Sequence, residues 1–398
     1  MTTILLVAPC VACLVAYCMA WVLVTRRVVT DRRTADTIAL VEATEPLPGL
    51  SILKPLCGVD EELEPNLRSF LEADHEPLQI LFAAADADDP AIELARRLAS
   101  EYPQRDVGFV VGADETIPSP KISLMEAMLP EAKHGMLLLS DSNVRLDRGD
   151  LTRVLPLFAD PRVGMIYQPV VAEGERTVAA TVENLHYTEF AAFLTIGVHE
   201  LVGLHTVNAK GQWVRRTALE AAGGFERVRD CGADDYELSQ QVEKAGWKLA
   251  PAATVVRVIQ RDWSWRNLAD RNLRHAGLRV RICPWAYPLE LLFNPVPFAA
   301  LLLLAGRLDV AAFGLFAIGA KVAMELSSAR LLRGRGLAWH LVPALIVKDF
   351  FIFACWFVAP FKRTAVWRGR VYRLLARGRI APLTGEAGGL PIPLETVV

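Results

Sequence analysis

The sequence predicts an α/β domain with a mostly parallel sheet, placed between an N-terminal membrane helix and C-terminal membrane segments. An uncharged apolar stretch lies at the N-terminus, strand-like and helix-like segments alternate from Leu50 to about Val170, and apolar segments return between Leu291 and Phe361. Alternation of this kind favours a parallel sheet that is covered by helices on both faces.

The stretch from Ile4 to Val24 holds 21 residues without a charge, which is enough to cross the core of a bilayer. Arginines follow it, and no Lys or Arg precedes it. A cleaved signal peptide would have a basic start and a shorter apolar stretch, so we expect a retained transmembrane anchor over residues 1–28. By the positive-inside rule the next domain lies in the cytosol, and in a bacterium the chain would be a multi-pass protein of the inner membrane.

Residues 48–256 are expected to form the cytosolic domain. The apolar runs that we expect to be strands are Leu50–Leu53, Leu78–Ala85, Val107–Val111, Met136–Leu139 and Val163–Tyr167. The segments that we expect to be helices are Leu63–Leu71, Ala91–Tyr102, Lys121–Lys133, part of Arg215–Glu226, and the stretch that opens at Asp234 and ends at Gly246. In such sheets, ligands bind at the carboxyl ends of the strands.

Residues 257–288 are expected to hold an amphipathic interfacial helix. Within Asp262–Ile282, Trp and aliphatic side chains recur on one side, and arginines lie roughly opposite. A basic helix with an apolar side suits the surface of a membrane. We therefore expect this helix to lie on the bilayer beneath the site.

The C-terminal membrane segments occupy residues 289–361. They are Leu291–Ala305, Val310–Leu326 and Leu337–Phe361. Three crossings would put the basic residues that follow outside the cell, against the positive-inside rule. We therefore expect one segment to be re-entrant or interfacial, namely the one that carries Lys348 and Asp349.

The remaining charge is informative in one place. The net charge is −2, so no basic excess indicates a nucleic-acid partner. Residues 362–398 begin with 7 Lys or Arg and no acid between Lys362 and Arg379, a patch that suits an anionic membrane surface, and we expect disorder after Ile380. The 7 cysteines show no ligand spacing and indicate neither a zinc site nor a disulfide framework.

Acidic side chains stand at the ends of predicted strands. Asp86 follows one strand, whereas Asp89, just before Pro90, is expected only to cap a helix. Asp141 and Asn143 follow another strand, and their oxygens suit Mg²⁺ or Mn²⁺, which completes its shell with water and substrate phosphates. A plain Asx turn is the alternative for this pair.

Further charged groups fit the same chemistry. Asp234 and Asp235 open a helix, where one is expected to cap it and the other to act as a general base. Arg271 and Arg274 share a helix face and are expected to grip a diphosphate, with lipid headgroups as the alternative partner. Lys121 opens an element at the same sheet edge, although an isolated lysine is usually solvated. Together they suit an enzyme that binds a nucleoside diphosphate donor and deprotonates an acceptor hydroxyl.

The chain resembles the ceramide glucosyltransferase family, membrane members of the family-2 glycosyltransferase group with a GT-A fold. The likeness runs from about Leu50 to Arg373 and rests on ordered matches. They are "SILKPLCGVDEELEPNLRSF", "DADDPAIELARRLASEYP", "SPKISL", "LLLSDSNVRL", "RRTALEAAGGF", "GADDYELSQQVEKAGW" and "WRGRVYRL".

The resemblance implies a role for each matching residue. Asp86 matches the aspartate that contacts the uridine of the donor, and Asp141 matches the one that meets the diphosphate and the metal. Asp235 matches the catalytic base, with Asp234 beside it as an accessory group, and Lys121 matches a lysine of the donor site. The implied cofactor is a divalent cation, Mg²⁺ or Mn²⁺.

The family ends its catalytic set with Gln or Arg-x-x-Arg-Trp on an interfacial helix. Here Arg271 and Arg274 are followed by His275, which stands where the family has Trp. This departure puts in question the stacking at the acceptor and the choice of sugar. His275 is expected to be a plain polar substitute, an accessory or acceptor-side residue, with a pH-sensitive contact as the alternative. A shifted register would instead give the stacking role to Trp263 or Trp265.

The implied activity is inverting transfer of a hexose, with glucose as the first expectation, from a UDP-sugar to a hydroxyl of a membrane lipid, with ceramide as the expected acceptor. A hopanoid-linked N-acetylglucosaminyl transferase of the same group is the alternative. A processive polysaccharide synthase would need more spanning helices than the C-terminal region offers. A non-catalytic membrane scaffold is the alternative from a different class.

Overall fold

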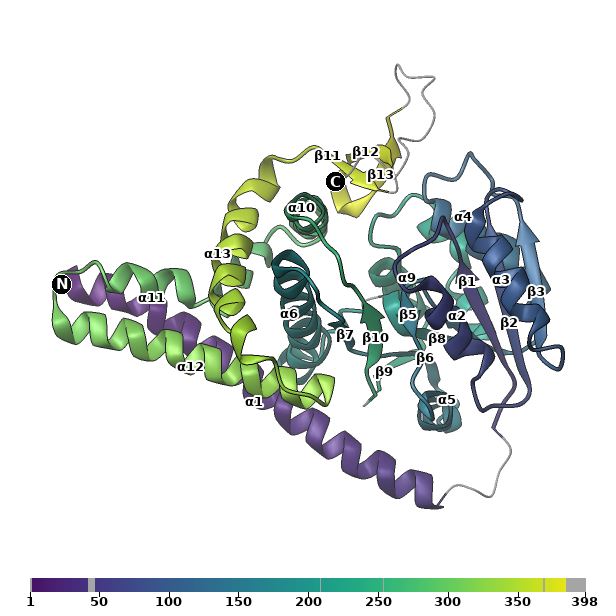
Figure 1. Ribbon diagram of the computed structural model, residues 1–398, viewed down its shortest axis with the longest axis horizontal. Coiled ribbons are helices and arrows are strands. Elements are labelled where there is room, and N and C mark those ends of the chain that lie inside the picture. Colours follow the sequence, from purple (N-terminus) through teal and green to yellow (C-terminus); the bar gives the residue numbers. More distant parts are fainter. Residues whose placement is uncertain (1, 42–46, 208, 253, 368, 384–398) are drawn as a thin grey trace.

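The core of the computed structural model is a seven-stranded sheet in the order β3-β2-β1-β4-β8-β6-β9 (Figure 1). The structure describes the whole chain except residues 1, 42–46, 208, 253, 368 and 384–398. The strands of this sheet are β1 (Leu50–Pro55), β2 (Leu78–Ala84), β3 (Asp106–Val111), β4 (Met136–Leu139), β6 (Val163–Tyr167), β8 (Gln212–Arg215) and β9 (Lys248–Pro251). Only β8 is antiparallel to its neighbours in this sheet, so the predicted fold class, a mostly parallel α/β sheet, is confirmed.

Helices cover both faces of this sheet. On one face pack α2 (Leu63–Leu71), α3 (Pro90–Ser100) and α5 (Asp150–Val154), and on the other pack α4 (Pro120–Met128), α8 (Arg216–Ala221) and α9 (Asp234–Lys244). The predicted helix Lys121–Lys133 is too long, because Pro130 lacks the backbone N–H that would continue it. A 3₁₀ turn at Leu129–Glu131 follows α4 instead.

The stretch between β6 and β8 contains elements that the sequence did not predict. They are β7 (Val170–Glu173), α6 (Val178–Ala192), a π-helical turn (Phe193–Gly197) and α7 (Val198–Val202). Helix α6 is buried on nearly all sides, and a helix in that position needs no polar face and shows no amphipathic pattern. A second small sheet joins β5 (Val144–Arg145), β10 (Val256–Ile259) and β7.

Three helices are long and apolar enough to cross a membrane: Val7–Asp31, Leu308–Arg333 and Trp339–Phe361. The first lies in α1 (Thr2–Val41), the second is α12 (Leu308–Arg333), and the third contains α13 (Pro343–Val358). The predicted segment Leu291–Ala305 yields only α11 (Val296–Leu302), which is about 10 Å long and cannot cross the roughly 30 Å of a bilayer core by itself.

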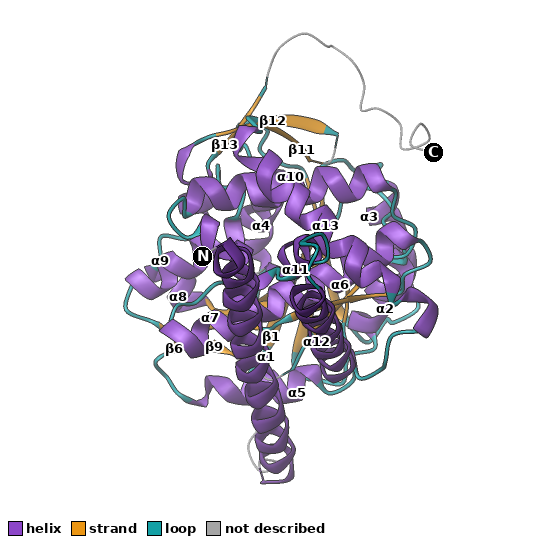
Figure 2. Cartoon of the chain, turned by 90° about the vertical axis from the view of Figure 1, so that its left-hand side faces the viewer, coloured by secondary structure: helices purple, strands orange, loops and turns teal. Residues whose placement is uncertain are grey.

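Helices α1, α11 and α12 lie side by side, whereas α13 runs across them (Figure 1). In Figure 2 the end of the molecule from which α1 and α12 project faces the viewer. By length α13 qualifies as a span, but its direction is the one that an interfacial helix would have. The expectation that the segment with Lys348 and Asp349 lies in the interface therefore stays a prediction, and the direction of α13 favours it.

The predicted amphipathic helix is α10 (Trp265–Ile282), and a small antiparallel sheet covers it (Figure 2). The strands of this sheet are β11 (Thr364–Trp367), β12 (Arg370–Leu374) and β13 (Ile380–Pro382). The backbone of Ile380 donates to the carbonyl of Asp230 at 2.7 Å, and that of Gly232 donates to Gly378 at 2.9 Å. The basic tail therefore folds into the small sheet β11–β13, which connects α10 to the loop before α9. We call this sheet the clasp. The predicted disorder after Ile380 falls mostly on residues 384–398, which lie outside the described residues.

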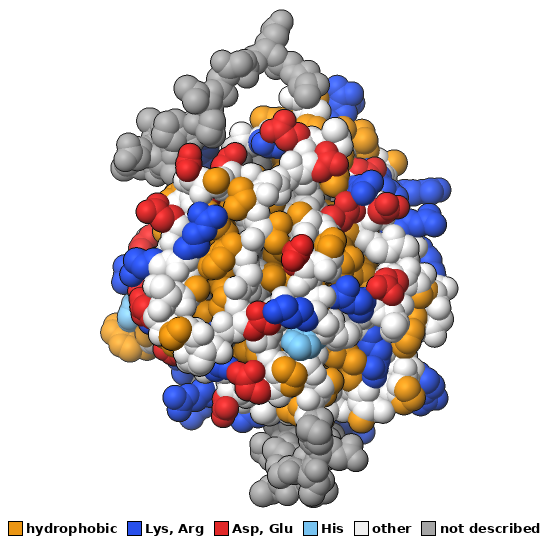
Figure 3. Space-filling model, turned by 90° about the vertical axis from the view of Figure 1, so that its right-hand side faces the viewer, with side chains coloured by type: hydrophobic (Ala, Val, Ile, Leu, Met, Phe, Trp, Pro, Cys, Tyr) orange, Lys and Arg blue, Asp and Glu red, His pale blue; other side chains and the backbone are white. Residues whose placement is uncertain are grey.

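The surface on the far side of the molecule from α1 and α12 carries mixed acidic and basic side chains (Figure 3). A face of this kind suits contact with water. Near the projecting helices, large apolar side chains are exposed instead, for example Leu308 (91%), Leu304 (82%) and Phe316 (63%). The surface away from α1 and α12 therefore suits water, and the surface near these helices suits an apolar environment. All 7 cysteines lie in the described part, and no disulfide joins them there.

Candidate active site at the carboxyl ends of the strands

The direction of the strands explains why distant residues meet at one edge of the sheet. Strands β1, β2 and β4 are parallel, so their carboxyl ends lie at the same edge. Strand β8 runs the opposite way, with Gln212 opposite Leu139, so β8 begins where β4 ends. The loop before β8 and the N-termini of α4 and α9 therefore reach the same edge as Asp141.

Four charged side chains form what we call the strand-end cluster: Lys121, Asp141, Lys210 and Asp234. The ammonium of Lys121 lies 2.8 Å from Asp234 Oδ2 and 3.4 Å from Asp141 Oδ1. The ammonium of Lys210 pairs with Asp141 and donates to Asn143 Oδ1 at 3.2 Å. These side chains remain 11–22% exposed, so a ligand can reach them.

The charged groups of this cluster shift one another's pKa values. Burial alone would raise the pKa of Asp141, but the ammoniums of Lys121 and Lys210 outweigh it and hold the pKa well below its usual range. Burial lowers the pKa of Lys121, yet Asp141 and Asp234 raise it above its ordinary value. For Lys210 burial dominates, and its pKa is lowered although Asp141 opposes the shift. Asp141 is therefore a permanent carboxylate that is surrounded by cations.

Lys54 lies directly beneath the cluster and is fully buried. Its ammonium donates to the carbonyl of Asp141 at 2.6 Å and to Ser140 Oγ at 3.3 Å, and it lies 3.8 Å from the ring centre of Phe70. Burial lowers the pKa of Lys54 well below its ordinary value. Lys54 holds the turn that presents Asp141.

The start of α9 differs from the expectation in one detail. The N-cap residue is Ala233, with no side-chain capping bond, so neither Asp234 nor Asp235 caps the helix. Asp234 turns its carboxylate to Lys121 instead, with which it forms a charge-assisted pair. The carbonyl of Asp235 accepts from Gln212 Nε2 at 2.9 Å, which fixes the backbone of the expected base to β8.

Asp86 and Asp89 behave differently from each other. Asp89 accepts from the backbone of Ala91 at 2.8 Å as the N-cap of α3, which confirms the structural role that the sequence predicted. It also accepts from the backbone of Gly58 at 3.0 Å. Asp86 lies exposed just beyond β2, at the same edge as Asp141, and no ion pair joins it to the cluster in the described part of the chain.

The arginines of α10 have protein partners in this structure. Arg271 Nε lies 3.0 Å from Glu183 Oε1, and its guanidinium lies 5.4 Å from the ring centre of Trp263. Arg274 lies 5.5 Å from the ring centre of Trp367 on β11. A tryptophan therefore flanks each arginine, while His275 is exposed. A shared diphosphate grip stays a prediction and would require both arginines to change partners.

Asp141 and Asn143 have the chemistry and the placement of cation ligands. Oxygens from both side chains meet one ammonium, that of Lys210, so they converge on a common point. Oxygen ligands of this kind fit Mg²⁺ or Mn²⁺. A divalent ion would take the place of the Lys210 ammonium between them.

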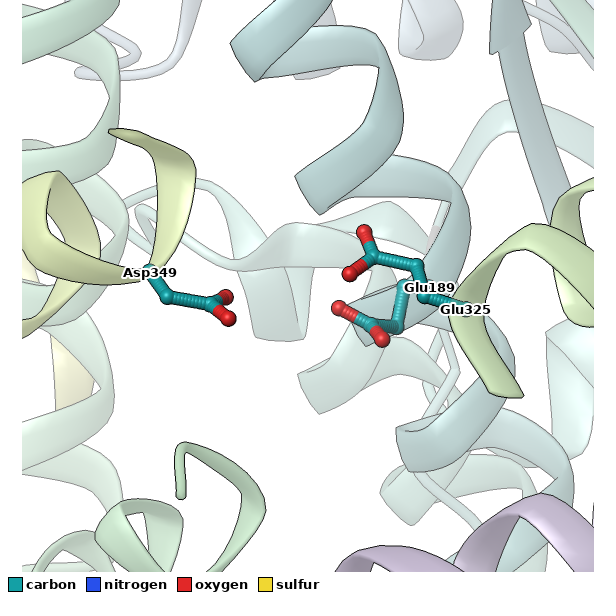
Figure 4. Close-up of side chains that lie close together, drawn as sticks. All are labelled: Glu189, Glu325 and Asp349. Carbon is teal, nitrogen blue, oxygen red and sulfur yellow. The ribbon is translucent and has the colours of Figure 1, made fainter. Parts of the chain in front are cut away.

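A second group of charges lies between the helices, and we call it the interhelix cluster: Glu189, Lys321, Glu325, Lys348 and Asp349. Its carboxylate oxygens lie within 4.8 Å of one another, and the carboxylates point toward a common centre (Figure 4). Lys321 lies 2.8 Å from Asp349 Oδ2, and Lys348 lies 2.7 Å from Glu325 Oε1. Because two ammoniums already pair with these three acids, the group has the form of an ion-pair network rather than a metal site.

Sequence reasoning missed two residues of the candidate site. Lys210 lies in a stretch without a clear pattern, and only the antiparallel direction of β8 brings it to Asp141. Trp367 lies in the basic tail, where alternating residues on both sides of Gly369 give a hairpin signal. That signal would have predicted the strands but not their contact with α10.

Comparison with known proteins identifies relatives over most of the chain. The model of Glycosyl transferase family 21 matches residues 5–380. Ceramide glucosyltransferase 1 of Caenorhabditis elegans is 24% identical over 355 residues, which are 85% of this chain and 74% of that protein. Ceramide glucosyltransferase 3 of the same organism is 24% identical over 259 residues, which are 65% of this chain and 56% of that protein.

The chain was also compared with solved structures. The mannosyltransferase PcManGT from Pyrobaculum calidifontis, in complex with GDP-Man and Mn²⁺, aligns over 86% of this chain and 98% of that chain. The TM-score is 0.49 and the identity is 16%.

Proposed function

Because the chain belongs to Glycosyl transferase family 21 and is therefore a sugar-nucleotide-dependent glycosyltransferase, we propose that it transfers glucose from UDP-glucose to the primary hydroxyl of ceramide. The observation that carries the proposal is the strand-end cluster, in which cations and carboxylates meet at the ligand-binding edge of the sheet, with Asp235 adjoining it. The names of the curated relatives favour a ceramide acceptor.

In this proposal the donor diphosphate binds at Lys121 and Lys210. The ammonium of Lys121 is held in place by Asp234, so it does not have to be ordered when the donor arrives. Asp86, at the neighbouring strand end, is exposed and accepts from the uridine. Arg271 and Arg274 would leave Glu183 and Trp367 to neutralise the leaving UDP.

A divalent cation, Mg²⁺ or Mn²⁺, would be held by Asp141 and Asn143. When bound, it supplies positive charge to the departing diphosphate. The carboxylate of Asp141 stays ionised for this role, because the neighbouring ammoniums depress its pKa.

Asp235 acts as the general base in the proposed reaction. It lies in the first turn of α9, where the partial positive charge of the helix N-terminus favours a negatively charged side chain. It removes the proton from the lipid hydroxyl while that oxygen attacks the anomeric carbon from the side opposite UDP. Displacement in one step inverts the configuration at that carbon, so an α-linked donor gives a β-linked product.

The membrane helices bring this site to its acceptor. A two-tailed lipid stays in its leaflet, and α10, which carries Arg271 and Arg274, packs against α13 of the third candidate membrane span. We propose that the N-terminus of α1 lies outside and that the catalytic domain lies in the cytosol, consistent with the arginines that follow the apolar stretch.

The test uses the full chain in nanodiscs with ceramide or a hopanoid polyol, and with UDP-glucose or UDP-N-acetylglucosamine. We expect a β-glucosylated ceramide by lipid mass spectrometry and proton NMR. Asp235→Asn should lose transfer by about 10²–10⁴-fold and keep its affinity for UDP. Glu237→Gln, on the same helix, serves as the control and should keep its activity.

Other outcomes would replace the proposal. Transfer of N-acetylglucosamine to the hopanoid polyol, without hexosylation of ceramide, would establish the alternative activity. UDP binding without transfer to any lipid would favour a non-catalytic scaffold. Full activity of Asp235→Asn would remove Asp235 as the base.

A further inference from the structure

Lys210 lies between the two side chains that would hold a divalent cation. Its ammonium pairs with Asp141 Oδ2 and donates to Asn143 Oδ1 at 3.2 Å. Both oxygens come from one turn, so a single ion can meet both. An ammonium and a metal ion cannot share that position, because they carry charge of the same sign. A cation can therefore bind here only after the Lys210 ammonium has left.

The turn that carries these oxygens is held without Lys210. Lys54 donates to the backbone carbonyl of Asp141 at 2.6 Å, and the backbone of Ile259 donates to the carbonyl of Asn143 at 3.4 Å. Both bonds remain when the Lys210 ammonium moves away. The side-chain oxygens of Asp141 and Asn143 are therefore preorganised for another cation.

The backbone next to Lys210 is anchored, so only the side chain has to move. The carbonyl of Gly211 accepts from the backbone of Gln168 at 3.3 Å, and a Cβ at Gly211 would lie 2.8 Å from Gln168 Oε1. The side chain of Gln212 is fixed to the carbonyl of Asp235 at 2.9 Å. The side chain of Lys210, in contrast, has a flexible four-carbon stem and is 15% exposed. Its ammonium can move while the neighbouring backbone stays in place.

Lys121, the second ammonium of the strand-end cluster, has a different arrangement. It lies 3.4 Å from the other carboxylate oxygen, Asp141 Oδ1, and closer to Asp234 Oδ2, at 2.8 Å. A cation at Asp141 Oδ2 and Asn143 would leave both of these pairs intact. Lys210 is therefore the group that must exchange its partner, and Lys121 is the group that stays.

The charges of the strand-end cluster are balanced. Within it, two carboxylates face two ammoniums. Outside it, Asp235 and Arg271 add one charge of each sign, and so do Asp60 and Lys54. A divalent cation alone would leave an excess of positive charge, and a diphosphate alone would leave an excess of negative charge. When both are bound the charges balance again, so each favours the binding of the other.

We propose that Lys210 is a tethered cation that fills the divalent-cation site until the donor arrives and then pairs with the donor diphosphate. This exchange makes the binding of the cation and the binding of the donor cooperative. The inference rests on the proposed function for the donor diphosphate and the cation ligands. It deepens that function by giving one side chain two alternating partners.

The experiment measures Mn²⁺ binding rather than sugar transfer. The full chain in phosphatidylcholine nanodiscs is titrated with Mn²⁺, with and without UDP, and free Mn²⁺ is followed by electron paramagnetic resonance. Protein-free nanodiscs with the same UDP show how much Mn²⁺ the nucleotide and the lipid bind. We expect weak binding to the chain without UDP and tighter binding with UDP. Because coupling between two ligands is reciprocal, Mn²⁺ should raise the affinity for UDP by the same factor.

Lys210→Met removes the ammonium and keeps most of the stem. Without UDP, its affinity for Mn²⁺ should be about 10–100-fold higher than that of the wild type, because the metal no longer has to displace a charge-assisted hydrogen bond to Asp141. The increase in Mn²⁺ affinity that UDP causes should shrink by a similar factor. Lys210→Ala repeats the test with the stem removed.

Lys210→Arg is the matched control, because it keeps a positive charge and hydrogen-bond donors at the same position. Without UDP it should bind Mn²⁺ as weakly as the wild type. Asp141→Asn should lose the Mn²⁺ binding, which assigns the signal to this site. The unfolding midpoint of each variant, measured in the same nanodiscs, shows that the chain is folded.

Three outcomes would overturn the inference even if the chain transfers sugar. The first is equal affinity of the wild type and Lys210→Met for Mn²⁺ without UDP, and the second is a gain in Lys210→Arg as large as that in Lys210→Met. The third is the absence of Mn²⁺ binding in the wild type and in every variant. UDP-dependent Mn²⁺ binding that Lys210→Met uncouples, without transfer to any lipid, would keep the inference and reject the proposed activity.

Discussion

The strand-end cluster and the interhelix cluster use the same side chains for different purposes. Both pair lysines with carboxylates at short distances. The strand-end cluster keeps its side chains 11–22% exposed and lies where strands end. The interhelix cluster is 0–10% exposed and joins α6, α12 and α13.

The difference lies in what else can pair with the charges. In the strand-end cluster the lysines can exchange a carboxylate for a phosphate, because solvent and ligands reach them. In the interhelix cluster every carboxylate already meets a lysine, and Tyr17 of α1 also donates to Glu189. A closed network fixes the packing of helices, whereas an open one binds a ligand.

The largest effect should come from removing a lysine of the closed network. Lys348→Met leaves Glu189, Glu325 and Asp349 with only Lys321 to neutralise them. We expect a loss of about 3–5 kcal/mol in the free energy of unfolding, because a buried charge without its partner is costly. Denaturant unfolding in detergent, followed by tryptophan fluorescence, measures it.

Lys248→Met is the control for Lys348→Met. Lys248 is 58% exposed, and its pair with Asp160 spans 3.7 Å, so its loss should change stability by less than about 1 kcal/mol. If Lys348→Met unfolded at the wild-type midpoint, the interhelix cluster would not be a structural network. Loss of transfer at unchanged stability would instead assign it to the reaction.

Removing a lysine of the strand-end cluster should change activity more than stability. Lys121→Met leaves Asp141 and Asp234 facing the donor diphosphate without that cation. We expect transfer to fall by about 10²–10³-fold, the loss that follows removal of one preorganised donor. Initial rates at saturating UDP-glucose measure it.

Lys133→Met provides the comparison, since Lys133 is 60% exposed and pairs with Asp106 at the opposite edge of the sheet. Its rate should equal that of the wild type. Wild-type activity of Lys121→Met would show that the strand-end cluster does not bind the donor. The wild-type unfolding midpoint in both variants would confirm that the open network is not needed for the fold.

The sequence predicted the parallel part of the site and missed the rest for a physical reason. Apolar runs gave the strands β1, β2 and β4, and the rule that parallel strands end at one edge placed Asp86 and Asp141 together. Lys210 was not predicted as a site residue because β8 is antiparallel and short, and no local sequence pattern shows the direction of a strand. The role of Asp235 stays a prediction.

The partners within the interhelix cluster could not be predicted from the sequence either. Lys348 and Asp349 were visible as charges inside an apolar segment, and they led us to expect an unusual helix. Their partner Glu189 lies on α6, a helix so fully buried that it has no amphipathic pattern. Pairing between segments 159 residues apart is a property of the fold and cannot be derived from either segment alone.

A smaller loss of activity should follow when the clasp formed by β11–β13 is disturbed and the strand-end cluster is left unchanged. Gly378 has a φ of +72°, and a Cβ there would lie 2.6 Å from Ile282 of α10, so Gly378→Ala should push the clasp away from the helix. Gly369 has a similar φ of +75° but nothing within 4 Å of its Cβ position. Gly369→Ala therefore carries the backbone strain without the clash.

We expect Gly378→Ala to lower transfer by about three- to tenfold more than Gly369→Ala does, roughly 1 kcal/mol in the barrier. The reason is that the clasp holds both α10 and the loop that leads to Asp235. Rates for both variants at saturating donor and acceptor measure the difference. Equal rates would show that the clasp does not position the site.

The smallest effect concerns Lys54, which combines features of the two clusters. It is fully buried like Lys321, but it lies beneath the strand-end cluster and has no carboxylate partner at ion-pair distance among the described residues. Lys54→Met removes a buried charge and keeps a similar shape. We expect a gain of about 1 kcal/mol in stability at pH 7, with slower transfer because the carbonyl of Asp141 loses its donor.

The pH dependence of that gain tests its cause. Burial lowers the pKa of Lys54 in the folded chain, whereas the unfolded chain has the ordinary value of about 10.4. Between these two values the unfolded state binds a proton that the folded state does not, so the wild-type chain becomes more stable as the pH rises toward 10. The variant lacks this group. The difference in unfolding free energy between the two chains should therefore shrink from pH 7 to about pH 9.5, and a constant difference would mean that Lys54 is not strained by its burial.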